Sequence, residues 1–236
     1  MAYCLALDFS RFSIITFDCY GTLIDWEAGI LGAIGPILSA HNAHLSDADI
    51  LRMYGEIEAD EESGEYHSYK EILQAVVRGF GIRLGFVPSD KEQQSLPNSL
   101  AHWKPFPDTV GALHRLKQNF QLGILSNIDD ELFSATAPQL KVAFDHVVTA
   151  SQAGAYKPSL DIFRLAQTKI GLPPQQWLHA GQSIYHDVIP AQSLGIATVW
   201  VNRPSPLPNS GAAKPARGRP DVEVSSLKEL ADLINK

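Results

Sequence analysis

Cysteine is scarce in this chain of 236 residues, which contains only Cys4 and Cys19. Two cysteines make neither a disulfide framework nor a structural zinc site, so both of these stabilising devices are excluded. A reducing, cytoplasmic location fits this cysteine usage best. We expect Cys19 to pack as a small apolar residue rather than to react.

Long apolar runs and basic clusters are also absent. No run approaches the roughly 20 residues that span a bilayer, so a membrane partner is not expected. The first apolar stretch contains Asp8 and Arg11 and lacks a basic leader, which argues against a signal peptide. The net charge is −7, with no basic stripe, so nucleic acid is not expected as a partner. A small molecule is the expected ligand.

Hydrophobic periodicity predicts an α/β protein with a Rossmann-like parallel sheet and one large helical insertion. Residues 27–100 show helical spacing without strand patterning, with 86–97 expected as a connector carrying a short helix. We therefore predict a core of residues 1–25 and 105–236, interrupted by a helical domain at 26–104. The expected strands are 12–18, 121–125, 146–149, 177–180, 197–201 and 222–224. The expected core helices are 110–120, 132–140, 160–170, 187–194 and 227–234, and 203–220 is expected to be a loop.

Polar side chains stand at the ends of these apolar strands. Asp18 follows the first strand, and Gly21 and Thr22 provide a sharp turn and a hydroxyl beside it. Carboxyl ends of parallel strands share one edge of a sheet, so such residues can converge on a ligand. An aspartate there is a candidate covalent nucleophile, although a turn or helix cap is the simpler interpretation of that residue alone. The other strand-end candidates are Ser126, Asn127, Lys157, Gln182 and Asp187.

Four ordered motifs together resemble the haloacid dehalogenase superfamily of hydrolases. They are DCYGTL at 18–23, LSN at 125–127, YKP at 156–158 and GQSIYHD at 181–187, and the helical insertion resembles that family's cap domain. The resemblance implies that Asp18 forms an aspartyl ester and that Ser126 and Asn127 hold the substrate. Lys157 would lower the pKa of Asp18 and keep it ionised. Asp187 would position Lys157 or activate the hydrolytic water.

Position 20 separates the branches of that superfamily. The phosphatases of that superfamily carry a second aspartate at this position, which protonates the leaving alcohol. This chain has Tyr20 instead. A phenol with an ordinary pKa near 10 is a poor replacement, but a departing halide needs no proton. Gln182 stands where phosphatases carry an acid that binds Mg²⁺, and an amide is a weaker ligand for that ion. The chain thus resembles the L-2-haloacid dehalogenase branch. This resemblance implies turnover without a metal or other cofactor.

Several positions depart from that branch. Its known members use an arginine of the cap near the halide, and Arg52 lies close to the comparable position without matching it. Phe163 and Ile184 replace an expected tyrosine and asparagine. Trp26 could contact the substrate from the cap side, as could Tyr20 and Thr22 beside the nucleophile. Dimers occur in the family, so a homodimer is possible. The alternatives are an Mg²⁺-dependent phosphatase of small esters and a weakly active member that serves as a binding protein.

Overall fold

The computed structural model describes residues 7–204 and 216–234. Within these ranges a six-stranded sheet has the order β3-β2-β1-β4-β5-β6, and every neighbouring pair is parallel. The chain builds β1, β2 and β3 in one direction and then crosses to the other side of β1 for β4. This reversal makes a switch point at the carboxyl ends of β1 and β4, where open α/β sheets bind ligands. The strands are β1 (Ile14–Phe17), β2 (Gln121–Ser126), β3 (His146–Thr149), β4 (Trp177–Gly181), β5 (Ala197–Val201) and β6 (Val222–Val224).

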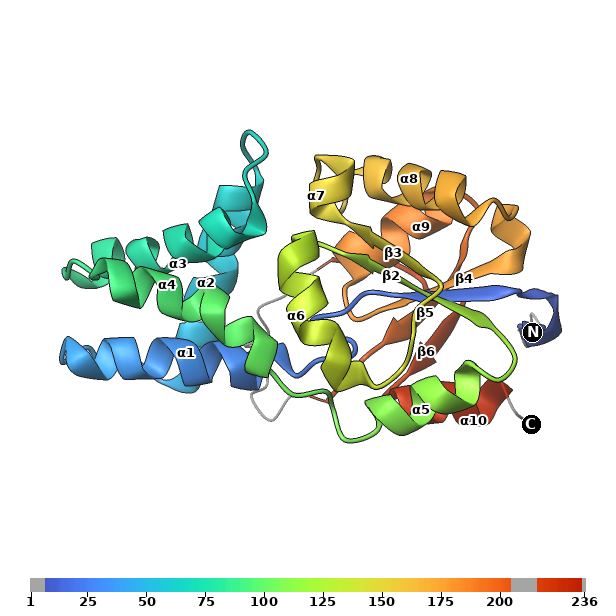
Figure 1. The fold of residues 1–236 in the computed structure, drawn as a ribbon, viewed down its shortest axis with the longest axis horizontal. Coiled ribbons are helices and arrows are strands. Elements are labelled where there is room, and N and C mark those ends of the chain that lie inside the picture. Colours follow the sequence, from blue (N-terminus) through green and yellow to red (C-terminus); the bar gives the residue numbers. More distant parts are fainter. Residues whose placement is uncertain (1–6, 205–215, 235–236) are drawn as a thin grey trace.

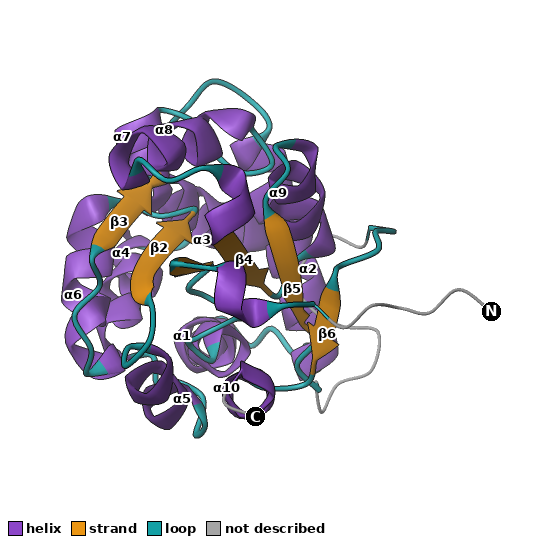
Figure 2. Ribbon diagram, turned by 90° about the vertical axis from the view of Figure 1, so that its right-hand side faces the viewer, coloured by secondary structure: helices purple, strands orange, loops and turns teal. Residues whose placement is uncertain are grey.

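Helices cover both faces of the sheet (Figures 1 and 2). On one face, α5 (Thr109–Leu116) packs against α10 (Leu227–Ile234), and on the other, α8 (Leu160–Ile170) packs against α9 (Ile189–Ser193). The central strand β1 is buried on both sides, as its largely apolar sequence predicts. The remaining core helices are α6 (Asp130–Leu140) and the single turn α7 (Ala150–Ala153).

Four further helices, which we call the four-helix block, lie beside the core (Figure 1). They are α1 (Trp26–Ala40), α2 (Asp47–Glu62), α3 (Tyr69–Leu84) and α4 (Asp90–Ser99). Ser46, Ser68 and Ser89 begin α2, α3 and α4, and each side chain accepts a hydrogen bond from an amide of the first turn. The sequence therefore fixes these helix starts locally, and apolar faces then hold the block together.

Two kinds of contact connect the block to the core. Its two linkers run side by side, with Asp25 N donating to Lys104 O (2.8 Å) and Phe106 N donating to Leu23 O (3.1 Å). Elsewhere, the Asp129 carboxylate accepts the first two amides of α3, both at 2.9 Å. The Tyr156 hydroxyl also donates to the His67 carbonyl at 2.8 Å.

The predicted fold class is confirmed, and each predicted strand overlaps an observed one. The expectation for residues 86–97 was incomplete, because α4 is a ten-residue helix that packs on α3 and buries Leu96. The helix expected at 187–194 starts earlier, with a π-helical turn at Ile184–Val188. Cys4 and most of the expected 203–220 loop lie outside the described residues. The proposed domain boundaries stay a prediction.

In the part of the chain that the structure describes, no helix combines the length and apolarity needed to cross a bilayer.

Candidate active site

Asp18 lies directly beyond β1, at the switch point of the sheet. Its amide extends the ladder by donating to Ala180 O (3.0 Å), so the residue is fixed between β1 and β4. Gly21 allows the following turn, because its φ of +87° favours glycine. A Cβ at Gly21 would also lie 3.0 Å from Nε1 of Trp26. The sharp turn brings the Thr22 hydroxyl back to donate to Oδ2 of Asp18 at 2.9 Å.

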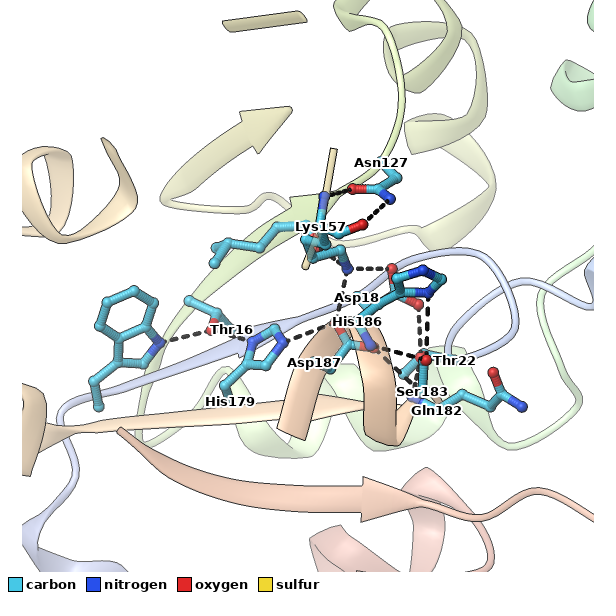
Figure 3. Close-up of polar contacts among 12 residues, drawn as sticks. Thr16, Asp18, Thr22, Asn127, Lys157, His179, Gln182, Ser183, His186 and Asp187 are labelled. Atoms are coloured by element: carbon cyan, nitrogen blue, oxygen red, sulfur yellow. Dashed lines mark hydrogen bonds and ion pairs between the residues drawn. The ribbon is translucent and has the colours of Figure 1, made fainter. Parts of the chain in front are cut away.

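Lys157 connects the two buried carboxylates of the site (Figure 3). Its Nζ lies 2.9 Å from Oδ1 of Asp18 and 2.7 Å from Oδ1 of Asp187. The third N–H donates to the Leu125 carbonyl at 3.0 Å. Since the side chain is 2% exposed, its charge is stabilised almost wholly by these partners.

Asn127 fixes the backbone that carries this lysine. Its Oδ1 accepts from the Lys157 amide at 2.7 Å, and its Nδ2 donates to the Lys157 carbonyl at 3.1 Å (Figure 3). The side chain of one motif thereby sets the position of the next. Asn127 also lines the cavity described below, but its amide acts mainly as a clamp on Lys157.

Asp187 projects from the π-helical turn after β4. The Ser183 amide donates to its Oδ2 at 3.2 Å, and Nε2 of His179 lies 3.2 Å from its Oδ1. Gly181 leaves the room that the carboxyl occupies, because a Cβ there would lie 2.4 Å from Cγ of Asp187. Backbone, histidine and lysine thus hold one carboxylate in a single orientation.

A buried polar chain continues behind Asp187 into the sheet, and the sequence analysis missed it. Nε1 of Trp177 donates to Oγ1 of Thr16 (2.6 Å), which lies 2.8 Å from Nδ1 of His179. Since an indole only donates, we assign the threonine proton to the bond with Nδ1. Nε2 of His179 then carries the ring proton and donates to Asp187. A signal was available, because Thr16 and His179 are polar residues at paired positions of two otherwise apolar strands.

Burial and neighbouring charges divide the carboxylates into two kinds. Burial raises the pKa of Asp18, and the charge of Asp187 adds to this effect, so together they outweigh Lys157. The expected net lowering of the Asp18 pKa was therefore wrong, because burial of the carboxyl outweighs the nearby ammonium. Burial also opposes the ionisation of Asp187, but Lys157 and His179 prevail and hold its pKa well below the usual range. The two carboxylates in turn raise the pKa of Lys157.

A cavity of about 60 Å³ opens over Asp18, between the core and the four-helix block. Ser126, Asn127 and Gln182 line its core side together with Lys157 and Asp187. Ser126 is 1% exposed, and within residues 7–204 and 216–234 its hydroxyl has no hydrogen-bond partner. A buried hydroxyl without a partner, at the wall of a cavity, is a candidate ligand contact.

The block supplies the opposite side of this cavity. Trp26, Tyr69, Glu58 and Glu62 line it, and the sequence analysis had not singled out either glutamate. Both belong to an acidic stretch that resembles an exposed helix face. The available signal was spacing, because Glu58 follows the buried Tyr54 by one helical turn. Arg52 instead lies on the exposed face of α2, paired with Asp49 and Glu56, and does not line the cavity.

Eight of the nine predicted site residues line this cavity, and Thr22 does not. Thr22 is fully buried, and its hydroxyl also accepts the Gln182 amide at 2.9 Å, so it positions Asp18 instead of meeting a substrate. Tyr20 presents its ring to the cavity, while its hydroxyl pairs with Thr136 at 2.8 Å. Burial raises the pKa of this phenol.

Other residues have structural roles. Phe163 packs edge-on against the His179 ring, with centroids 5.2 Å apart. Cys19 is fully buried, and burial raises the pKa of its thiol, in line with the expected packing role.

The donor set does not match a Mg²⁺ site. Oδ1 of Asp18 and Oδ1 of Asp187 both bind the Lys157 ammonium, which occupies the position between the two carboxylates. Gln182 adds an amide rather than a third carboxylate. Across the described residues, no cluster of three or more His, Cys, Asp or Glu side chains has a metal-binding arrangement.

Comparison with known proteins identifies relatives along most of the chain. The family model for haloacid dehalogenase-like hydrolases matches residues 12–195. An (S)-2-haloacid dehalogenase of Pseudomonas fluorescens is 25% identical over 223 residues, covering 93% of this chain and 95% of the relative. A glyceraldehyde 3-phosphate phosphatase of Methanothermobacter thermautotrophicus is 29% identical, over 54% of this chain and 58% of its own.

Solved structures share the fold at lower identity. The L-2-haloacid dehalogenase of Xanthobacter autotrophicus superposes with a TM-score of 0.81 at 19% identity, covering 95% of this chain and 98% of the other.

Proposed function

Since this chain belongs to the haloacid dehalogenase-like hydrolases, we propose that it hydrolyses a small 2-haloacid through a covalent ester of Asp18. The observation that carries the proposal is the contact between Asp18 and Lys157, 2.9 Å apart at the wall of this cavity. The (S)-2-haloacid dehalogenases among its relatives match nearly the whole chain, whereas the glyceraldehyde 3-phosphate phosphatases match about half of it.

In the proposed reaction, a carboxylate oxygen of Asp18 attacks C2 of the substrate. The new C–O bond forms as the carbon–halogen bond breaks, and the halide leaves with the bonding electron pair. Water then attacks the ester carbonyl of Asp18, releasing a 2-hydroxy acid and regenerating the carboxylate. Lys157 and the Thr22 hydroxyl stabilise the negative charge on the Asp18 oxygens during the second step.

Further roles follow from the contacts of each residue. Asp187 keeps Lys157 in place as a fixed anion, and Ser126 is the proposed partner of the substrate carboxylate. We also propose that residues 26–104 act as the cap, that residues 1–25 and 105–236 form the catalytic core, and that turnover needs no metal. A cytoplasmic location and a homodimer stay predictions.

The negative charge of the cavity lining argues against the phosphatase alternative. A phosphate dianion would enter a cavity lined by four carboxyl side chains, with Lys157 already committed to two of them. The Tyr20 hydroxyl, bonded to Thr136, is not available as the leaving-group acid.

The test combines substrate choice with isotope labelling. Both enantiomers of 2-chloropropionate and p-nitrophenyl phosphate are assayed with and without EDTA. The proposal expects chloride release that EDTA does not affect. A single turnover in oxygen-18 water should then place the label in the Asp18 peptide. Phosphatase activity that EDTA abolishes, or turnover without label in that peptide, would overturn the proposal.

A further inference from the structure

The cavity over Asp18 contains an excess of acidic groups. Among the described residues, Lys157 is the one lysine or arginine that lines it, and all three of its N–H groups already have acceptors. Asp18 and Asp187 together exceed that charge by one. Every further carboxylate that enters, including that of a simple haloacid, adds to an uncompensated negative potential.

Helix α2 places two more carboxyl groups on the opposite wall. Glu58 and Glu62 are four residues apart, so both project from the same face of the helix. The hydroxyls of Tyr54 and Tyr69 both donate to Oε1 of Glu58 and fix its direction. Glu62 lines this cavity and also an adjoining one of about 330 Å³ beside Tyr156.

Within the described ranges, 7–204 and 216–234, neither glutamate has a cationic partner of its own. Burial raises the pKa of Glu58, although the hydrogen bonds from the two tyrosine hydroxyls lower it. Burial and the charge of Glu58 raise the pKa of Glu62, which only Lys157 and the Asn127 amide oppose. A partly buried carboxyl of this kind gains most from a bound cation that can also donate hydrogen bonds.

Independent of these acids, Ser126 marks the same cavity as a ligand site. Its hydroxyl is buried at the core side and has no partner in the described part of the chain. The cavity therefore offers a hydrogen-bond donor for an anionic group on one wall and two carboxyls on the other. Asp18 is the reactive group of the cavity they share.

We propose that the substrate is a zwitterion, a small 2-haloacid that also carries an ammonium group, and that Glu58 and Glu62 bind this ammonium. The inference rests on the proposed dehalogenation and specifies its substrate class. The bonds that change are unaltered, because Asp18 still displaces the halide from C2. The ammonium is not consumed, and it brings the charge of the entering molecule to zero.

An isosteric pair of substrates tests the inference directly. In 3-amino-2-chloropropanoate an ammonium replaces the terminal methyl group of 2-chlorobutanoate, with little change in size. A charged hydrogen bond in a buried site contributes about 1.5–3 kcal/mol, which corresponds to roughly 10–100-fold. We expect kcat/KM for chloride release to favour the amino compound by that factor.

Variants of the two glutamates test whether they cause the preference for the amino compound. Glu58→Gln and Glu62→Gln should each reduce the preference, and the double variant should abolish it. Glu61→Gln is the matched control, since it removes the same charge from an exposed position of the same helix. An equal preference in wild type and double variant, or faster turnover of 2-chlorobutanoate by the wild type, would overturn the inference.

A binding measurement separates this inference from the proposed chemistry. Calorimetry with Asp18→Asn compares 3-aminopropanoate with butanoate, so no reaction is required. The inference expects tighter binding of 3-aminopropanoate that Glu62→Gln weakens in the same background. Equal binding overturns it, even if oxygen-18 still labels Asp18 in the wild type. Selective binding of 3-aminopropanoate without any halide release by the wild type would instead contradict the dehalogenase proposal and support the ammonium site.

Discussion

Nζ of Lys157 lies 2.9 Å from Oδ1 of Asp18, and the same nitrogen lies closer still to Asp187. The proposed nucleophile therefore shares its counter-ion with a stronger acid. Burial and, after it, the charge of Asp187 leave Asp18 with a raised pKa although it contacts an ammonium, and the shared lysine links the behaviour of the two carboxylates.

Removing the shared cation should damage both activity and stability. In Lys157→Met, two buried carboxylates lose their partner, which we expect to cost about 3–5 kcal/mol of unfolding free energy. Halide release should fall by at least ~10²-fold because the charge on the ester oxygens is no longer stabilised. Urea unfolding and a halide assay measure the two effects. Lys91→Met, at an exposed position of α4, is the control, and halide release by Lys157→Met at the wild-type rate would contradict the role.

The pH profile should report the Asp18 carboxylate. Its pKa is raised above the ordinary 3.8, so the reactive anion is lost as the pH falls through that higher value. We expect the acid limb of kcat/KM at this higher pH. Asp187→Asn removes a neighbouring negative charge and frees Lys157, so the limb should move to lower pH even as the maximal rate decreases. A limb that stays in place or moves upward would argue against the coupling.

Gly181 should not tolerate a side chain. Its added Cβ would lie 2.4 Å from Cγ of Asp187, so the carboxyl must leave its position beside Lys157. We expect Gly181→Ala to lose most halide release and ~1–3 kcal/mol of unfolding free energy. Gly111→Ala on α5, where a Cβ meets nothing within 4 Å, should be neutral or stabilising by up to about 1 kcal/mol. Equal activity in the two variants would count against this placement of Asp187.

The buried polar chain of Trp177, Thr16 and His179 behind Asp187 should weaken when the Thr16 hydroxyl is removed. Thr16→Val leaves the Trp177 indole N–H buried without an acceptor and removes the donor to His179. We expect a loss of about 1–3 kcal/mol in unfolding free energy and a pH profile altered through Asp187. Thr16→Ser restores the hydroxyl and should recover both properties. If the serine variant behaves like valine, packing and not the hydrogen bond is responsible.

Tyr20 should be dispensable for proton transfer. Its hydroxyl pairs with Thr136, so Tyr20→Phe removes one hydrogen bond while keeping the ring in the cavity. Unfolding free energy should fall by about 0.5–1.5 kcal/mol, and kcat should change little. A kcat decreased by two orders of magnitude, with stability unchanged, would instead assign the phenol to catalysis.

Sequence alone predicted the parts of this protein that depend on local patterns. The six strands are short apolar runs between turn residues, and the residues that follow them share one edge because the sheet is parallel. Four motifs therefore converge without any knowledge of side-chain contacts. The helix α4 was underestimated because its sequence is mostly polar and only Leu96 and Pro97 are buried.

What the sequence could not supply was the direction of individual side chains. Thr22 was expected to meet the substrate, but the Gly21 turn directs its hydroxyl to Asp18. Glu58 and Glu62 lie in a charged stretch of α2, and spacing from the buried Tyr54 indicates an inward face without showing that this face meets a cavity. The direction of the Asp18 pKa shift depended first on the burial of the carboxyl and then on the charge of Asp187, and no motif encodes either of them.

The two attachments of the four-helix block differ in what it takes to undo them. The paired linkers are covalent, whereas Asp129 and Tyr156 hold the start of α3 by hydrogen bonds alone. Lifting the block away from the core breaks the second attachment and spares the first. We therefore expect product escape to depend on the hydrogen bonds of Asp129 and Tyr156, two side chains that do not line the cavity over Asp18.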